Sequence, residues 1–139
     1  ISPTALVKAR RRAEAAGLGS AVRWVEVDLM AWTPGECWDL VVTSCAHPPG
    51  NQIDFYRRIA RWVAPGGTLL VVGHLHGSGV MSGEEAPEET TVTLEHVAGL
   101  FEGGDWSIET ARQNARTATA RDGSDVEMRD VVVRARRLR

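Results

Sequence analysis

The segment that decides the fold runs from residue 39 to residue 72 and reads DLVVTSCAHPPGNQIDFYRRIARWVAPGGTLLVV. Residues 40–43 near its start form a short apolar run of the kind found in buried parallel strands. Residues 68–72 at its end form a second such run, and the Ala64-Pro65-Gly66-Gly67 sequence before it fits a type II turn. Between the two runs, apolar residues recur at the spacing of an amphipathic helix: Ile53, Tyr56, Ile59, Ala60 and Val63.

The residues before this segment predict a helix and a further strand. Ser2-Pro3 is typical of a helix N-cap followed by proline at the first helical position, and Gly17 ends the helical run. The helix is marked by apolar residues at helical spacing: Leu6, Ala9, Ala13 and Ala16. Residues 22–27 alternate and are rich in β-branched and aromatic side chains, which predicts a strand that ends at Asp28.

The residues after this segment predict a helix over residues 94–101, capped near Thr93, and then two strands. Residues 106–111 and 128–135 have strand character and are joined through Asp122-Gly123-Ser124, so we expect an antiparallel pair. The alternation of buried strands and helices predicts an α/β fold, with a mostly parallel sheet covered on both faces. We expect a single domain over residues 1–139, because a chain of this length suits one core.

The composition is that of an ordinary globular protein, with 43% hydrophobic and 24% charged residues. A net charge of -2 gives no reason to expect nucleic acid or an anionic membrane as a partner. No apolar run approaches the roughly 20 residues that span a bilayer. Cys37 and Cys45 would lie ~26 Å apart along the expected strand at ~3.3 Å per residue, too far for a disulfide. Free thiols predict a cytoplasmic location.

Five pieces of the sequence, in order, resemble the class I S-adenosylmethionine-dependent methyltransferases. Ile1-Ser2-Pro3-Thr4-Ala5-Leu6 resembles the family's D-x-S-x-x-x-L-x-x-A segment after its second strand. Val25-Glu26-Val27-Asp28-Leu29 resembles the third strand, and Asp39-Leu40-Val41-Val42-Thr43-Ser44 resembles the fourth. Leu69-Leu70-Val71-Val72 after the Pro-Gly-Gly turn resembles the fifth, and the terminal hairpin is similar to the family's antiparallel last strands. Gly73-His74 and the compact C-terminus are most similar to small-molecule methyltransferases of the tellurite-resistance and thiopurine type.

The resemblance implies a Rossmann-like three-layer sandwich with the strand order 3-2-1-4-5-7-6. The family's first two strands, its G-x-G-x-G loop and the acidic residue that grips the ribose would lie before Ile1, so this chain would hold half of the cofactor pocket. The gap between residues 22–27 and residues 40–43 then has three solutions. In the first, which we favour, an upstream segment supplies the missing strands. In the second, the two segments pair directly, and in the third, strands pair across a homodimer.

The resemblance also implies methyl transfer from S-adenosylmethionine to a small-molecule acceptor. Asp28 would accept a hydrogen bond from the adenine amino group, and Leu29 would supply a backbone contact. Ser44, Cys45 and Ala46 would lie beside the methionine part of the cofactor. His47 is the candidate general base for a hydroxyl or amine acceptor, since an unperturbed imidazole titrates near ~6.5, whereas a thiolate acceptor needs no base.

Three further features bear on the site. His74 and His76 follow the next parallel strand and are candidate substrate contacts, but no carboxylate or thiolate accompanies them at ligand spacing, so we expect no metal site. Trp32 is a candidate neighbour of the adenine. Residues 77–89 lack a buried face and are glycine-rich, then acidic, which predicts a mobile lid.

Simpler readings and other functions remain open. Asp28 can also be an ordinary aspartate of a turn at a strand end, without a role in cofactor binding. His47 can also be an ordinary polar residue of a proline-bounded turn, without a role in catalysis. A different Rossmann-like enzyme is one alternative function, although the terminal antiparallel hairpin counts against it. A binding module that keeps the fold without catalysis is the other.

Overall fold

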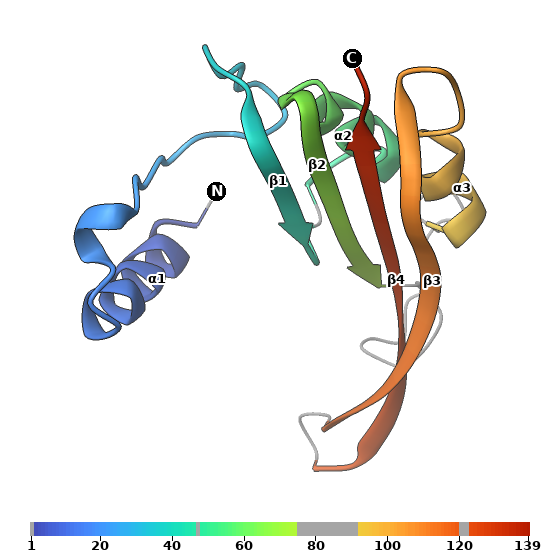
Figure 1. Ribbon diagram of the computed structural model, residues 1–139. Coiled ribbons are helices and arrows are strands. Elements are labelled where there is room, and N and C mark those ends of the chain that lie inside the picture. The colour runs from blue at the N-terminus through green and yellow to red at the C-terminus, as the bar shows by residue number, and fades with distance from the viewer. Residues whose placement is uncertain (1, 47, 75–91, 120–122) are drawn as a thin grey trace. The chain divides into compact units, whose positions relative to one another are not determined.

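The computed structural model describes residues 2–46, 48–74, 92–119 and 123–139. The chain divides into two compact units, Ile1–Thr33 and Pro34–Arg139. The elements are labelled in Figure 1 and follow the order α1 (Pro3–Ala15), the short 3-10 helix η1 (Gly19–Ala21), β1 (Trp38–Ser44), α2 (Gln52–Ala60), β2 (Val63–His74), α3 (Leu94–Gly99), β3 (Trp106–Thr119) and β4 (Asp125–Arg137). None of the helices in the described residues is long and apolar enough to cross a membrane.

The first unit contains the predicted N-terminal helix but not the predicted strand. Ser2 caps α1, because its Oγ accepts a hydrogen bond from the Ala5 backbone N–H at 3.3 Å. The strand expected over residues 22–27 is wrong, since residues 22–28 have no regular secondary structure. Their composition favours a strand, but a strand needs a partner for its backbone groups. None of the described strands pairs with them, so direct pairing with residues 40–43, one of the three solutions that the sequence left open, is not formed among the described residues.

The second unit is a four-stranded mixed sheet with the order β1-β2-β4-β3. β1 and β2 are parallel, with Leu40 opposite Thr68 and Ser44 opposite Val72. β4 is antiparallel to both β2 and β3. The two predicted buried strands, the helix between them and the terminal antiparallel pair are confirmed.

β2 begins at Val63, earlier than the predicted start at Thr68. Trp38 pairs with Val63 and Leu40 pairs with Thr68, so residues 64–67 form an irregular insertion in the ladder. Gly66 has a φ of 82°, the positive value that the third position of a type II turn requires. The glycine predicted for a turn thus lies within the strand.

The core lies between one face of the sheet and the helices α2 and α3. Both helices lie behind the strands in Figure 1, and Phe55, Ile59 and Val97 on these helices are fully buried. The buried apolar side chains of the strands are those of Val41, Val63, Leu69, Val71, Val131, Val133 and Ala135. The alternate residues Leu40 and Val42 of β1 are 59% and 54% exposed. Within the described part of the second unit, helices therefore cover one face of the sheet.

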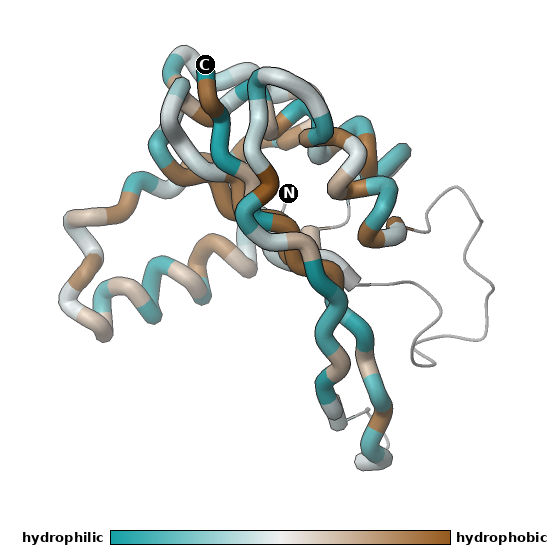
Figure 2. Tube along the Cα trace, turned by 45° about the vertical axis from the view of Figure 1, so that its right-hand side comes forward, coloured by the Kyte–Doolittle hydropathy of each residue, from teal (hydrophilic) through white to brown (hydrophobic). Residues whose placement is uncertain are grey.

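The hairpin of β3 and β4 continues past the end of β2. His74 at the end of β2 lies opposite Asp130, whereas β3 and β4 go on pairing as far as Thr119 and Asp125. Arg116 and Asp130 form an ion pair at 2.7 Å at the base of this two-stranded arm. The arm is mostly exposed, and Figure 2 shows that it is largely hydrophilic. It extends from the edge of the sheet at which β1 and β2 end.

Candidate functional site

The carboxyl ends of β1 and β2 meet at one edge of the sheet. β1 ends at Ser44, opposite Val72, and β2 ends at His74. In open α/β sheets, ligands bind beyond the carboxyl ends of parallel strands. Three of the predicted site residues lie here: Ser44 is the last residue of β1, and Cys45 and Ala46 follow it directly.

Cys45 has an unusual backbone conformation. Its φ is 50°, and within the described residues it is the one non-glycine residue with a positive φ. Its N–H donates to the Val72 carbonyl at 2.8 Å, and the Ser44 hydroxyl donates to its sulfur at 3.8 Å. A non-glycine residue persists in this region only where its surroundings impose the conformation, and such residues cluster at functional sites. The turn after β1 is therefore fixed by contacts with β2.

Gln52 holds the next residue of this turn. Its Nε2 donates to the Ala46 carbonyl at 2.8 Å, and the side chain is buried with 8% exposed. Gln52 is the first residue of α2, which Asn51 caps by accepting hydrogen bonds from the N–H groups of Ile53 and Asp54. The helix start and the turn after β1 are thus joined through one amide side chain.

Tyr56, one turn further along α2, connects Gln52 to the end of β2. The side chain is 3% exposed and is hydrogen-bonded to Gln52. Burial raises the pKa of Tyr56 above its ordinary value of 10.0, the Gln52 hydrogen bond opposes the rise, and Cys45 adds to it electrostatically. A Cβ atom at Gly73 would lie 2.9 Å from the Tyr56 hydroxyl, so only glycine leaves room for that group.

These supporting residues were not identified from the sequence as part of the site. Tyr56 was predicted only as an apolar position of the helix, and Gln52 was not singled out. The available signal was the position of Gln52 directly after the Asn51 cap, at the start of a helix that follows a strand end. At that position the side-chain amide of Gln52 lies next to the turn after β1.

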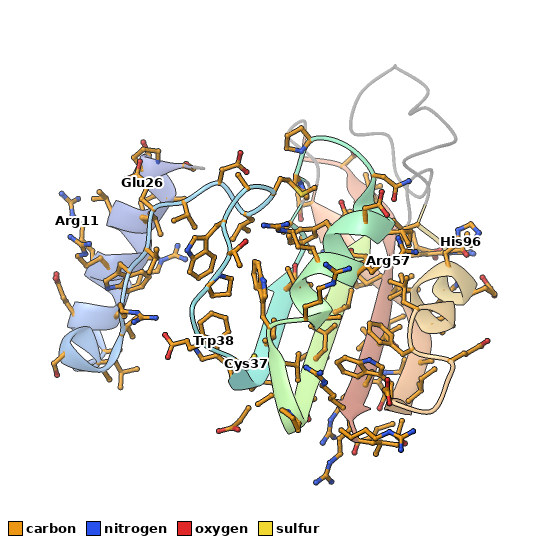
Figure 3. The ribbon with its side chains drawn as sticks, turned by 90° about the horizontal axis from the view of Figure 1, so that it is seen from above. Arg11, Glu26, Cys37, Trp38, Arg57 and His96 are labelled. Atoms are coloured by element: carbon orange, nitrogen blue, oxygen red, sulfur yellow. The ribbon has the colours of Figure 1, made fainter. Side chains whose placement is uncertain are left out.

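The amino-terminal ends of the same two strands are closed by apolar packing. The rings of Trp38 and Trp62 meet edge to face with centroids 6.3 Å apart. The backbone N–H of Trp38 also donates to the backbone carbonyl of Trp62 at 2.8 Å. Figure 3 shows Trp38 beside Cys37 at the start of β1. Cys37 and Cys45, which flank the strand, are both free thiols, so the predicted absence of a bridge between them is confirmed.

Asp28, Leu29 and Trp32 belong to the first unit. Asp28 is exposed, and its Oδ1 accepts a hydrogen bond from the Met30 N–H at 2.9 Å. Its carbonyl oxygen accepts from the N–H groups of Ala31 and Trp32. Asp28 therefore stabilises a turn, while its exposed carboxylate remains accessible to a ligand.

The predicted histidines are described only in part. His47 and His76 lie outside the described residues, as does the predicted lid at residues 77–89. His74 is the last residue of β2. Among the residues that the structure describes, no three His, Cys, Asp or Glu side chains converge in a way that would hold a metal ion.

No protein-family model and no curated protein matches the sequence, but solved structures do. One match is a protein whose structure concerns the conversion of a disulfide bond into a thioacetal group during echinomycin biosynthesis. It is 26% identical, with a TM-score of 0.67, and the match covers 98% of this chain and 63% of that one. TehB from Haemophilus influenzae is 16% identical, with a TM-score of 0.73 and coverage of 98% and 47%. A SAM-dependent methyltransferase from Methanosarcina mazei is 16% identical, with a TM-score of 0.57 and coverage of 99% and 79%.

The matches run over nearly the whole of this chain, which spans 63% and 47% of the lengths of the first two proteins. The four-stranded mixed sheet of this chain is consistent with their fold. The chain therefore has the fold of the class I S-adenosylmethionine-dependent methyltransferases.

Proposed function

We propose that the protein containing residues 1–139 transfers a methyl group from S-adenosylmethionine to a small-molecule acceptor. The observation that carries the proposal is the positive φ of Cys45 at the carboxyl end of β1, in a chain with this fold. Backbone outliers of this kind cluster at ligand sites, and ligands of open α/β sheets bind at this edge of the sheet. The Ala46–Gln52–Tyr56 network supports the proposal, because it holds the turn in one conformation.

The residues present fit the cofactor chemically. The exposed carboxylate of Asp28 is suited to accept a hydrogen bond from the adenine amino group, next to the backbone of Leu29. The residues Ser44, Cys45 and Ala46 would hold the methionine part, with the Ser44 hydroxyl exposed at the strand end. When bound, the cofactor supplies an already activated sulfonium methyl, so the protein's tasks are alignment of the acceptor and exclusion of water.

Three histidines complete the proposal on the acceptor side. His47 would take a proton from a hydroxyl or amine acceptor, and His74 and His76 would contact that acceptor. The free thiols of Cys37 and Cys45 support a reducing, cytoplasmic setting.

We also propose that the remainder of the cofactor site and a third layer of the sandwich come from outside residues 1–139. The support is twofold: the neighbouring structures are longer than this chain, and Leu40 and Val42 present an apolar face that the described helices of the second unit leave uncovered. Sheets with parallel strands are commonly covered on both faces. The four strands would then occupy positions 4, 5, 7 and 6 of a seven-strand sheet.

Calorimetric titration with S-adenosylmethionine and its demethylated product tests the proposal on the protein as its cell makes it. We expect binding of both, and Asp28→Ala to weaken it about tenfold or more, because a charge-assisted hydrogen bond contributes about 1.5–3 kcal/mol. Glu26→Ala, an exposed acidic residue of the same segment, is the matched control and should leave the affinity unchanged. Equal affinities for Asp28→Ala and wild type would remove Asp28 from the site, and no binding at all would overturn the function.

A further inference from the structure

A pocket of about 260 Å³ lies at the opposite end of the sheet from the candidate methyl-transfer site. It opens between the C-terminal end of α2, the segment after α3 and the paired residues Trp106 and Arg137 of β3 and β4. Arg137 follows Arg136, which pairs with Thr68, whereas the site edge is marked by His74 opposite Asp130. A ligand in this pocket would therefore be separate from the cofactor and the methyl acceptor.

The rim of the pocket carries more positive than negative charge. Three arginines and one acidic residue line it: Arg57, Arg61, Arg137 and Asp105. Asp105 is already paired with Arg139 at 2.8 Å, and Arg57 is paired with Asp54 at 2.5 Å. The two outside partners, Arg139 and Asp54, carry opposite charges, so the positive excess of the rim is unchanged.

The guanidinium groups of Arg137 and Arg61 differ in what they contact within the described part of the chain. Arg137 donates to the main-chain oxygens of Val63 at 2.7 Å and Arg139 at 3.0 Å, which fixes its side chain. For the side chain of Arg61, no hydrogen bond or ion pair is formed among the described residues. Arginine presents a planar fork of N–H donors that matches a carboxylate or a phosphate.

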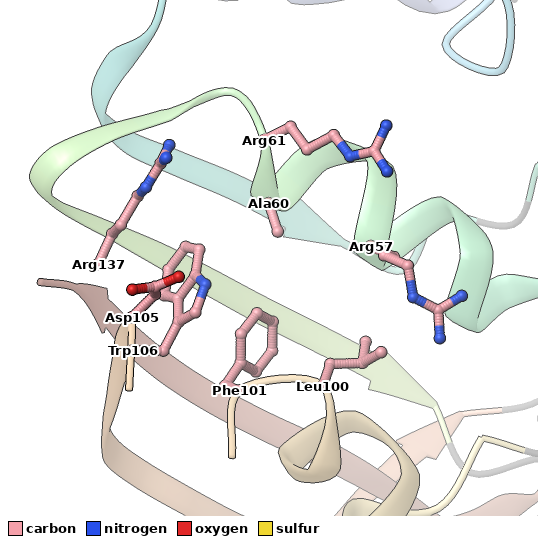
Figure 4. A pocket seen from close by; sticks show the side chains of 8 residues that line it. All are labelled: Arg57, Ala60, Arg61, Leu100, Phe101, Asp105, Trp106 and Arg137. Atoms are coloured by element: carbon pink, nitrogen blue, oxygen red, sulfur yellow. The ribbon is translucent and has the colours of Figure 1, made fainter. Parts of the chain in front are cut away.

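The floor of the pocket is aromatic. Phe101 is 2% exposed and meets Trp106 edge to face, with ring centroids 5.1 Å apart. Figure 4 shows Trp106, Phe101 and Leu100 in a row, with Arg137 at one end and Arg57 at the other. An apolar floor with a few polar groups around it is a usual composition of a small-molecule site, and the volume suits a compound of one ring.

We propose that this pocket binds a small aromatic anion, with its ring on Phe101 and Trp106 and its carboxylate or phosphate on Arg61. The ring would stack against the aromatic floor, and the anionic group would neutralise the charge that no protein carboxylate meets. Because the pocket is remote from the carboxyl ends of β1 and β2, this binding is independent of the proposed methyl transfer.

NMR titration of the chain with benzoate and phenyl phosphate tests the proposal. The sequence holds five tryptophans, and Trp106→Phe identifies the indole N–H signal of Trp106. We expect a saturable shift of that signal with one or both anions, and the tighter of the two identifies the anionic group. Benzyl alcohol, which lacks the charge, and cyclohexanecarboxylate, which lacks the aromatic ring, should bind at least several-fold more weakly.

Arg61→Ala should weaken binding of the tighter anion about tenfold or more, since it removes a charged donor. Arg112→Ala, an exposed arginine of β3 outside the pocket, makes the same change in net charge and should leave the affinity unchanged. Thermal unfolding confirms that both variants remain folded. The proposal is overturned if no anion gives a saturable shift, if benzyl alcohol binds as tightly as benzoate, or if Arg61→Ala binds as wild type does.

Discussion

At the scale of single residues, Tyr56 links the two strand ends that form the candidate site. Its hydroxyl lies against Gly73 of β2, and its partner Gln52 holds the Ala46 carbonyl after β1. A buried polar group that loses such a partner destabilises the fold by about 1–3 kcal/mol. The same side chain therefore serves the core and the site, and two measurements can separate these contributions.

Tyr56 should titrate above the ordinary tyrosine pKa of 10.0, because burial disfavours the phenolate. It is the single tyrosine of the sequence, so tyrosinate absorbance reports it alone. Since the pKa is raised in the folded state, the associated stability is complete below pH about 10 and is lost as the pH rises through the folded pKa. Tyr56→Phe should abolish the absorbance change and reduce this loss. A folded-state transition at the pKa of the unfolded chain would contradict the burial argument.

Gly73→Ala should destabilise the fold by about 1–3 kcal/mol, because the new Cβ would lie 2.9 Å from the Tyr56 hydroxyl in a closed core. In a Tyr56→Phe background the hydroxyl is gone, so most of this penalty should disappear. Denaturant unfolding of the two single variants and the double variant measures the coupling. An equal effect of Gly73→Ala in both backgrounds would show that the hydroxyl contact is not its cause.

At the scale of secondary-structure elements, β2 combines a regular strand with an irregular start. Residues 64–67 are an insertion relative to β1, and the ladder becomes regular only from Thr68. Gly66 supplies the positive φ of this insertion, and Gly67 supplies the space. A Cβ at Gly67 would lie 2.9 Å from the Ala64 carbonyl oxygen and 3.0 Å from that of Asp39, and backbone atoms move less easily than a side chain.

Alanine substitutions should therefore rank in a definite order. Gly66→Ala should destabilise by about 1–2 kcal/mol, the penalty of a left-handed conformation for an L-residue. Gly67→Ala should destabilise more, because β2 or β1 must shift its backbone. Gly35→Ala is the matched control: a Cβ there meets open space and needs no positive φ, so the change should stay within about 0.5 kcal/mol. Denaturant unfolding checks the order. It would be contradicted if Gly67→Ala reduced the free energy of unfolding no more than Gly35→Ala does.

The comparison of residues 22–27 with residues 40–43 shows where sequence inference ends. Both segments are rich in β-branched side chains, and both were predicted as strands. Residues 40–43 became part of β1 because β2 lies beside them with a matching apolar face. Residues 22–28 have no such neighbour among the described strands. Local propensity can be read from a sequence, but strand pairing depends on a partner that local pattern does not reveal.

The candidate site was predictable to a similar extent. Ser44, Cys45 and Ala46 could be placed at a strand end because the strand–helix–strand order already implies a parallel pair. The Gln52 and Tyr56 contacts could not be placed in the same way. They depend on how a helix face meets two strand ends, which side-chain geometry decides.

At the scale of the whole molecule, β1 is an edge strand of the sheet in the described residues: one of its edges pairs with β2, and the other has no strand beside it. β1 is the first strand in the order β1-β2-β4-β3, so within the described residues its outer edge has no strand partner. Cys45 donates to Val72, and by alternation the N–H groups of Leu40 and Val42 point away from β2. An apolar free edge recruits further strands, whether from outside residues 1–139 or from a second copy.

For residues 1–139 alone, we propose that the available partner is a second copy, and we expect a concentration-dependent dimer with β1 pairing across a twofold axis. The amide of Val42 should exchange rapidly with deuterium in dilute solution and slowly at high concentration, because only the dimer gives it an acceptor. Val42→Lys should keep the chain monomeric, since a charge at an edge opposes strand addition. Leu138→Lys changes an equally exposed apolar residue outside the sheet, and it should dimerise as wild type does. A chain that stays monomeric at every concentration would contradict the homodimer. Protection of Val42 in a longer, monomeric protein would instead assign the edge to a strand outside residues 1–139, as the proposed seven-strand sheet requires.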